Sequence, residues 1–213
     1  MTEQQLREQM ASLARSLFMR GYVSGGAGNI SVRLPDGNIL ISPTGSSFGE
    51  LNPDALSKLS PEGELLAGDP PSKEWPMHMA MYANRVKCGA VVHLHSTWLT
   101  ALSCLSGLPE DNCLPPITPY YVMRVGKLPL LPYMRPGSPE LAPAVAAKAP
   151  THVAVLLANH GPVVSGKDLA QAVANAEELE DTARLFLLLR SQPYNMLSPA
   201  NVTELEQMQL ARS

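Results

Sequence analysis

Charged residues are scarce in this chain. Asp, Glu, Lys and Arg make up 16% of its 213 residues, below the quarter that is usual in soluble domains. The formal net charge is −3 and no block of basic residues occurs, which argues against nucleic acid as a partner. Low charge together with 20 prolines is what we expect of a compact chain with many fixed turns and a large subunit interface.

Long apolar runs and a cysteine framework are also missing. No apolar run approaches the roughly 18 residues of a membrane-spanning helix, so we expect no membrane partner. The start, MTEQQLREQM, contains acids and no apolar core, so no secretory signal is expected. The three cysteines, Cys88, Cys104 and Cys113, are an odd number without framework spacing. This pattern predicts reduced thiols in a cytoplasmic protein.

Apolar periodicity and turn residues predict helices interleaved with strands. We expect helices over residues 2–21, 72–85, 138–149 and 168–190 and a last one from Ser198, with strands over residues 30–34, 39–41, 89–96, 128–133 and 152–161. Ser72 is the expected N-cap of the second helix, which puts Lys73 and Glu74 in or beside its first turn. No repeat or linker interrupts this order, so residues 1–213 are predicted to form a single mixed α/β domain.

Two histidines lie two residues apart in the strand-like run VVHLHS, residues 91–96. Residues i and i+2 of a strand point to the same side, so His93 and His95 present two imidazoles on one face. Burying both rings costs free energy unless their nitrogens find partners. A metal ion is one such partner, because Zn²⁺ binds histidine nitrogen. Hydrogen-bonded core or interface histidines are the alternative.

A third imidazole and a carboxylate strengthen the metal hypothesis. His160 ends the apolar run LLANHG, where binding residues often lie in α/β folds. Three neutral imidazoles with room for substrate are typical of a catalytic zinc site. Glu74 is the acid/base candidate, although the helix dipole alone also favours a glutamate there. His78, four residues after Glu74, either supports the site or lies at the surface, and His152 is expected to be structural.

Three polar turns offer candidate anion sites. They are GAGNIS (26–31), SPTGSS (42–47) and PSKE (71–74). Each combines accessible backbone N–H groups with a hydroxyl, amide or ammonium group, which suits phosphate, and Lys73 adds a positive charge. None matches a P-loop or a dinucleotide fingerprint. Beside a metal site, the three turns together indicate a small phosphorylated substrate.

The order and spacing of GNIS, SPTG, a Ser-x-Glu at a helix start, HLHS and NHG resemble the class II aldolase family. That family includes fuculose-phosphate aldolase, ribulose-phosphate 4-epimerase and the adducin head domain. The resemblance runs from about Gly21 to Arg190. It implies a three-layer α/β/α fold around a mainly antiparallel sheet. It also implies a homotetramer with fourfold symmetry and an active site at the subunit interface.

The same resemblance implies roles for individual residues. It implies one Zn²⁺ per subunit, bound by His93, His95 and His160, with Glu74 as the fourth ligand or the proton-transfer group. It further implies that Asn29, Thr44, Gly45 and Ser72 hold phosphate. The polar turns add Gly28 and Lys73 as candidate substrate-binding residues. A tyrosine that aldolases take from a neighbouring subunit corresponds to either Tyr120 or Tyr121, and both remain open.

One position departs from the aldolase pattern. Aldolases typically have Ser-Ser-Glu where this chain has Ser72-Lys73-Glu74, and the stretches PSKE, VVHLHSTW, TPYYVMR and LLANHGPVV are most similar to the 3-oxo-tetronate 4-phosphate decarboxylase branch. That branch implies loss of CO₂ from a phosphorylated four-carbon keto acid through a zinc-stabilised enediolate, which gives dihydroxyacetone phosphate.

Other functions and folds remain as alternatives. They are a ketose 1-phosphate aldolase, a pentulose-phosphate 4-epimerase and a non-catalytic assembly domain of the same fold. Four convergent candidate ligands argue against the assembly domain, because a scaffold does not need them. A cupin fold also uses two histidines in this spacing. The helices expected over residues 2–21 and 168–190 argue against it.

Overall fold

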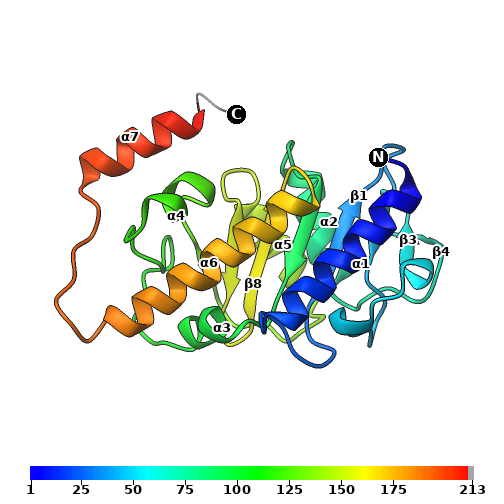
Figure 1. Cartoon of the computed structure of the whole chain (residues 1–213), viewed down its shortest axis with the longest axis horizontal. Coiled ribbons are helices and arrows are strands. Elements are labelled where there is room, and N and C mark those ends of the chain that lie inside the picture. The colour runs from blue at the N-terminus through cyan, green and yellow to red at the C-terminus, as the bar shows by residue number, and fades with distance from the viewer. Residues whose placement is uncertain (211–213) are drawn as a thin grey trace.

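The computed structural model describes residues 1–210, which contain one open eight-stranded sheet (Figure 1). The strands are β1 (Asn29–Arg33), β2 (Ile39–Ile41), β3 (Ser57–Leu59), β4 (Leu65–Ala67), β5 (Ala90–His93), β6 (Leu130–Leu131), β7 (Ala154–Leu157) and β8 (Gly161–Gly166). Their order across the sheet is β4-β3-β2-β1-β5-β8-β7-β6. All neighbours are antiparallel except β6 and β7. The sheet does not close, so the cupin alternative is wrong.

Helices cover both faces of the sheet. They are α1 (Glu3–Met19), α2 (Trp75–Asn84), α3 (Thr97–Ser103), α4 (Pro119–Arg124), α5 (Leu141–Lys148), α6 (Leu169–Leu189) and α7 (Pro199–Leu210), with short 3-10 turns at Phe48–Glu50 and Pro53–Ala55. Helices α1 and α6 cross the near face in Figure 1, and α2 and α5 lie behind the sheet. The predicted three-layer α/β/α fold is confirmed.

Alternating side chains of β5 divide the interior into two cores. Val92 belongs to the core that contains Met10 of α1 and Leu179 of α6. Val91 belongs to the core that contains Met81 of α2 and Val145 of α5. Successive residues of a strand point to opposite faces, so one buried strand serves both layers. His93 points to the same side as Val91.

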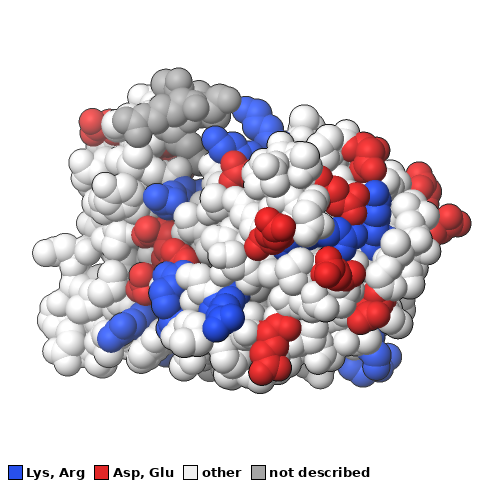
Figure 2. Space-filling model, turned by 45° about the vertical axis from the view of Figure 1, so that its right-hand side comes forward, with Lys and Arg blue, Asp and Glu red and all other residues white. Residues whose placement is uncertain are grey.

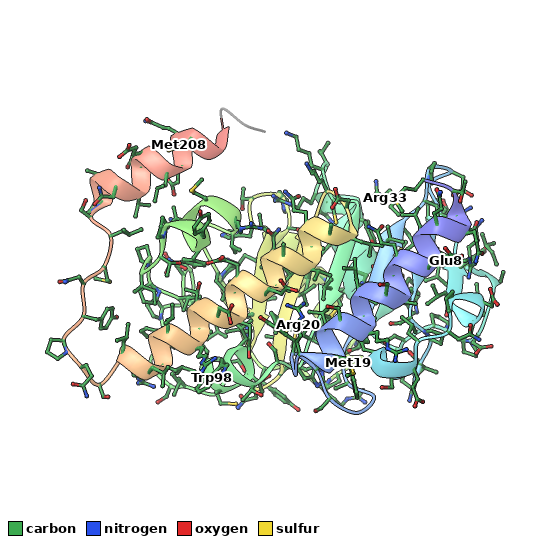
Figure 3. All side chains as sticks on the ribbon, in the orientation of Figure 1. Glu8, Met19, Arg20, Arg33, Trp98 and Met208 are labelled. Atoms are coloured by element: carbon green, nitrogen blue, oxygen red, sulfur yellow. The ribbon has the colours of Figure 1, made fainter. Side chains whose placement is uncertain are left out.

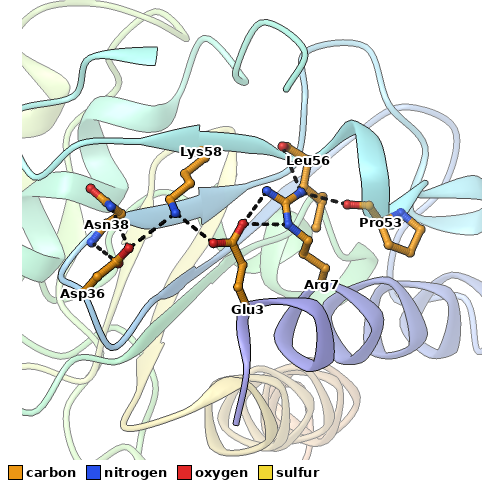
Figure 4. Close-up of polar contacts among 7 residues, drawn as sticks. All are labelled: Glu3, Arg7, Asp36, Asn38, Pro53, Leu56 and Lys58. Carbon is orange, nitrogen blue, oxygen red and sulfur yellow. Dashed lines mark hydrogen bonds and ion pairs between the residues drawn. The ribbon is translucent and has the colours of Figure 1, made fainter. Parts of the chain in front are cut away.

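The N-terminal helix is fixed to the sheet by charged side chains. Glu3 accepts hydrogen bonds from Arg7 and from Lys58 of β3, each at 2.8 Å (Figure 4). Arg7 also donates to the carbonyl oxygen of Pro53 at 3.0 Å, and Lys58 lies 3.3 Å from Asp36. These contacts join α1 to the β1–β2 turn and to β3. On the face in Figure 2, acidic and basic side chains are interspersed rather than gathered into one block.

The second helix starts later than the sequence predicts. Ser72 is not its N-cap: α2 starts at Trp75, Glu74 is the N-cap residue, and Pro76 lies in the first turn. Proline suits that place because it has no N–H to donate and its φ is already helical. Glu74 therefore lies at the N-terminal end of α2 and not within the helix.

The expected strand over residues 89–96 is also too long, because β5 ends at His93. Likewise, β7 covers only part of the expected strand over residues 152–161, and β6 only part of 128–133. Other elements lie where the sequence predicts them: the hairpin of β1 and β2 and the helices α1, α5, α6 and α7. Within residues 1–210, no helix combines the length and apolar character needed to cross a membrane.

Candidate metal centre and substrate pocket

Three segments bring four candidate ligands together at one end of the sheet. His93 ends β5 and His95 follows it by two residues, while His160 lies in the turn between β7 and β8. Glu74 precedes α2. Because β5 and β8 are neighbours, their ends meet. This end is the one near Trp98, opposite Arg33, in Figure 3.

The ligand atoms of the four side chains converge. The Nε2 atom of His95 lies 3.0 Å from Nε2 of His93 and 3.0 Å from Nε2 of His160. The Glu74 carboxylate lies 3.4 Å from His93 Nε2 and 3.3 Å from His160 Nε2. All four ligand atoms lie within 4.8 Å of one another. A tetrahedral ion with bonds of about 2.0–2.1 Å spaces its ligands about 3.3–3.4 Å apart, so the cluster has suitable dimensions.

The hydrogen bonds around the cluster leave acceptor atoms without donors. His93 Nδ1 donates to the carbonyl oxygen of Pro162 at 2.8 Å, so its Nε2 carries a lone pair directed at the other rings. Among the described residues, the buried Oε1 of Glu74 has no hydrogen-bond partner. Converging buried lone pairs are costly unless a cation or a donor satisfies them. A divalent cation fits this donor set.

The protonation states also suit a cation. Burial lowers the pKa of His93 to about 3 and also lowers the pKa of His95, so both rings are neutral at neutral pH. Burial alone would raise the pKa of Glu74, but the His160 and His93 rings and the Asn29 amide outweigh it and lower that pKa. His93 and His95 therefore offer neutral imidazoles, and Glu74 offers an ionised carboxylate.

The predicted substrate-binding residues line a pocket beside this cluster. Its volume is about 290 Å³. Predicted residues in its wall are Gly28, Asn29, Thr44, Gly45, Ser72, Lys73, Glu74, His95 and His160. Pro136 and Gly137, which follow β6, also line it. The structure thus brings every predicted site residue except the buried His93 to one pocket wall, and His93 lies directly behind it.

Backbone contacts hold the polar turns next to each other. Thr44 N donates to the Pro70 carbonyl oxygen at 2.9 Å, and Ser72 N donates to the Ser42 carbonyl oxygen at 3.2 Å. Gly28 has a φ of +78°, and a Cβ there would lie 2.8 Å from the His93 carbonyl oxygen. Only glycine satisfies both conditions. The first turn therefore packs directly on the strand end that carries His93.

The model of the family described as "Class II Aldolase and Adducin N-terminal domain" matches residues 8–187. The chain belongs to this family. It is 54% identical over 203 residues to the 3-oxo-tetronate 4-phosphate decarboxylase of Escherichia coli strain K12, covering 95% of this chain and 96% of the relative. It is also 36% identical over 184 residues to the L-fuculose phosphate aldolase of Methanococcus maripaludis strain DSM 14266, covering 86% and 97%.

Solved structures of class II aldolase family members agree with this assignment. The Escherichia coli protein YgbL, described as an aldolase, epimerase or decarboxylase, superimposes with a TM-score of 0.95. The two sequences are 52% identical, and the match covers 96% of this chain and 99% of YgbL. The resemblance inferred from the short motifs is confirmed.

The two weaker histidine candidates, His78 and His152, lie in different places relative to the cluster. His78 is fully buried, not at the surface, and its Nε2 lies 2.5 Å from Asn29 Oδ1. Asn29 Nδ2 in turn donates to Glu74 Oε2 at 2.8 Å. His152 lies away from the cluster, where its Nδ1 is 3.1 Å from the Lys148 carbonyl oxygen. His78 therefore supports the candidate site and His152 does not.

The two tyrosines that remained open for a neighbouring subunit also differ. Tyr121 is fully buried, and its hydroxyl lies 3.0 Å from both Asn112 Oδ1 and the Leu114 carbonyl oxygen. Tyr120 is 60% exposed. Of these two tyrosines, only Tyr120 therefore has a side chain that is accessible at the surface.

Several residues of the site carried no sequence signal. Pro136 and Gly137 belong to a proline-rich stretch that resembles any other turn. Pro162 contributes only its carbonyl oxygen, which any residue possesses. Glu180 lies on α6, 85 positions after His95 in the numbering, and its carboxylate accepts from Ser96 Oγ at 2.6 Å. Among the supporting residues, only His78 had a sequence signal, because it lies four residues after Glu74.

Proposed function

We propose that the chain catalyses the metal-dependent decarboxylation of a 3-oxo-tetronate 4-phosphate. The products are dihydroxyacetone phosphate and CO₂. The observation that carries the proposal is the cluster of Glu74, His93, His95 and His160 beside a pocket lined by anion-binding turns. Relatives with this activity are 46–54% identical over most of the chain, which supports a lyase with this substrate.

The phosphate end of the substrate is assigned to the polar turns. Backbone N–H groups of Gly28 and Gly45 and the hydroxyls of Thr44 and Ser72 are the proposed donors. Ser72 Oγ accepts from Glu74 N at 3.3 Å, so its own hydrogen remains for donation. Charge-assisted hydrogen bonds contribute about 1.5–3 kcal/mol each. They fix where the reacting carbons lie relative to the cluster, which lowers the entropic part of the barrier.

The reaction breaks the bond between C1 and C2 of a β-keto acid. C1 leaves as CO₂, and the electron pair that remains on C2 is conjugated with the C3 carbonyl. His93, His95 and His160, with Glu74 as the fourth ligand in the resting protein, would hold a divalent ion that would supply Lewis-acid stabilisation for this charge. Glu74 Oε1, which lacks a hydrogen-bond partner among the described residues, is the atom proposed to carry a proton from solvent to C2. Protonation there completes dihydroxyacetone phosphate.

Lys73 is proposed to pair with the substrate carboxylate, which an aldolase substrate lacks. Its side chain is exposed and lines the pocket next to Glu74. We expect Lys73→Met to raise KM for decarboxylation about tenfold, and Lys73→Arg to restore most of the affinity because the charge is kept. Unchanged decarboxylation by Lys73→Met would remove this role.

A sugar-phosphate aldolase or epimerase is the second candidate. It is favoured by the 36% identity to the L-fuculose phosphate aldolase. Aldol cleavage leaves the same enediolate on one fragment, so a single site can serve either reaction. The second product distinguishes them, because an aldolase releases an aldehyde and a decarboxylase releases CO₂.

The deciding experiment is an assay of the zinc-loaded protein on 3-oxo-tetronate 4-phosphate, in which CO₂ and dihydroxyacetone phosphate are followed together. Equal amounts of both products, abolished by His93→Ala, would support the proposal. A protein that holds zinc and releases no CO₂ would contradict it. Cleavage of ketose 1-phosphates and epimerisation of pentulose 5-phosphates would then be measured.

We also propose one Zn²⁺ per subunit, a homotetramer and a cytoplasmic role in carbohydrate metabolism. Three imidazole nitrogens and a carboxylate oxygen are a donor set typical of zinc. Leu185 and Leu188 near the end of α6 are 43% and 57% exposed, which supports a subunit contact there. The free thiols of Cys88, Cys104 and Cys113 support a reducing compartment. Metal analysis and light scattering of the purified protein test the first two points.

A further inference from the structure

A buried chain of hydrogen bonds leads from α2 through β1 to the metal centre. Its four links are Tyr82 OH to Ser31 Oγ at 2.7 Å, Ser31 Oγ to His78 Nδ1 at 2.7 Å, His78 Nε2 to Asn29 Oδ1 at 2.5 Å and Asn29 Nδ2 to Glu74 Oε2 at 2.8 Å. Ser31 and His78 are fully buried and Asn29 is 2% exposed. Water therefore does not compete for these links.

The ionised carboxylate of Glu74 sets the direction of the first links. A carboxylate accepts hydrogen bonds only, so Asn29 presents its NH₂ group to Glu74 and its carbonyl oxygen to His78. The Asn29 carbonyl oxygen, too, can only accept a hydrogen bond. His78 must therefore carry its hydrogen on Nε2 and donate it to Asn29.

The remaining links follow from the neutral state of His78. Burial lowers the pKa of His78 to about 4, so at neutral pH the ring has one hydrogen, on Nε2, and an acceptor at Nδ1. Ser31 then donates its only hydrogen to Nδ1, and Tyr82 donates to Ser31. The opposite tautomer would place two acceptors against each other, either at Asn29 Oδ1 or, after an amide flip, at Glu74 Oε2.

We propose that His78 is a positioning residue for the metal centre: its Nε2–H holds the Asn29 amide in the orientation that donates to Glu74 Oε2. Oε1 of Glu74 is thereby left turned toward His160, whose Nε2 is 3.3 Å away. His78 lies behind Asn29, away from the pocket wall. The inference rests on the proposed metal role of Glu74 and does not depend on the identity of the substrate.

Two substitutions separate the hydrogen bond from the packing of the ring. In His78→Gln the amide NH₂ lies near the place of Nε2 and keeps a donor for Asn29. His78→Leu fills similar space without any donor. His152→Leu is the matched control, because it removes a histidine that lies away from the cluster.

The first measurement is the Zn²⁺ dissociation constant, obtained by competition with a chromophoric chelator. Loss of a partner that orients a ligand typically weakens metal binding 10–100-fold. We expect that range for His78→Leu, a change within about threefold for His78→Gln, and no change for His152→Leu. Equal weakening by the Gln and Leu variants would mean that only packing matters and would overturn the proposal, as would wild-type affinity in a folded Leu variant.

The second measurement determines the tautomer of His78 in the wild-type protein, so it does not depend on whether a variant folds. Long-range ¹H–¹⁵N spectra of the wild-type protein with labelled histidine report which ring nitrogen carries hydrogen. We expect His78 as the Nε2–H tautomer, with Nδ1 unprotonated, from pH 6 to 8. An Nδ1–H tautomer would overturn the proposal.

Steady-state kinetics complete the design. His78→Leu is expected to lower kcat of the zinc-loaded enzyme about 10–100-fold with KM within about threefold, since the phosphate contacts are untouched. A rise in KM as large as the fall in kcat would contradict a positioning role. If the wild-type protein turned over no keto-acid phosphate, the proposed function would fail, while the zinc affinities and the tautomer would still decide the role of His78.

Discussion

Ser96 Oγ donates a hydrogen bond to Glu180 Oε2 at 2.6 Å, although the two residues are 84 positions apart in the chain. The same carboxylate accepts from Trp98 N at 2.7 Å and from Leu99 N at 2.9 Å. Glu180 is 6% exposed, and Ser96 directly follows His95. A buried carboxylate of α6 therefore fixes the first turn of α3 and, with it, the segment that carries one of the candidate metal ligands.

Removal of this carboxylate should weaken the fold and the metal centre together. Glu180→Ala leaves three donors without a partner, and we expect a loss of about 2–4 kcal/mol in the free energy of unfolding. Glu180→Gln should lose roughly half as much, since one oxygen remains. Urea denaturation measures the effect. Glu178→Ala is the control, because within residues 1–210 the Glu178 carboxylate accepts one hydrogen bond, from Thr182 at 3.3 Å. An equal loss of stability there would contradict the assignment.

Two glycines of the pocket should respond differently to alanine. Gly28 and Gly45 have φ values of +78° and +72°, so alanine at either is strained by about 1–2 kcal/mol. Only at Gly28 does the new Cβ meet backbone, the His93 carbonyl oxygen at 2.8 Å. We expect Gly28→Ala to lower the free energy of unfolding further than Gly45→Ala and to weaken zinc binding as well. Equal effects on stability and on zinc affinity would show that the contact with β5 does not matter.

Loss of the metal should abolish activity without unfolding the protein. Lewis-acid stabilisation supplies several kcal/mol, so chelation or His93→Ala should reduce kcat/KM at least about 10³-fold. Circular dichroism should remain that of a folded α/β protein, because two apolar cores hold the sheet. Addition of Zn²⁺ should restore the chelated wild-type enzyme but not the variant. Activity that persists at a measured metal content near zero would refute the assignment.

The stability of the metal-free protein should fall on acidification. His78 titrates at about 4 in the fold and near 6.5 when unfolded. Between these values the unfolded chain binds a proton that the folded chain does not, so the contribution is complete above pH 6.5 and is lost toward pH 4. It amounts to up to about 3 kcal/mol. The free energies of unfolding of wild type and His78→Gln should converge as the pH falls from 7.5 to 4.5. A difference that stays constant over this range would contradict the low pKa of His78.

Much of the site could be predicted because its chemistry lies in short local patterns. His93 and His95 share one side through the period of a strand, and this holds even though His95 lies beyond the end of β5. Gly28 and Gly45 adopt the positive φ values that glycine-rich turns favour. The four candidate ligands that these patterns predict lie within 4.8 Å of one another. Their role as ligands stays a prediction.

The elements that the sequence did not reveal are short or start with turn residues. Strands β3 and β4 have three residues each, too few to show a period. Strand β8 begins with Gly161-Pro162, which resembles a turn. Hydrogen bonding to neighbouring strands specifies these elements, and that information is not local. The same limit hid Glu180, whose partners lie more than 80 positions earlier in the chain.

Glu74, His93 and His160 come from distant parts of the chain, and the pairing of β5 with β8 must exist before they meet. No single segment of the unfolded chain reproduces this set of ligands. An ion would therefore bind only the folded chain and would add its binding free energy to the folded state alone. Interactions that form after the folding transition state slow unfolding and leave folding unchanged. Bound metal would therefore lengthen the lifetime of the native protein without shortening the time needed to form it.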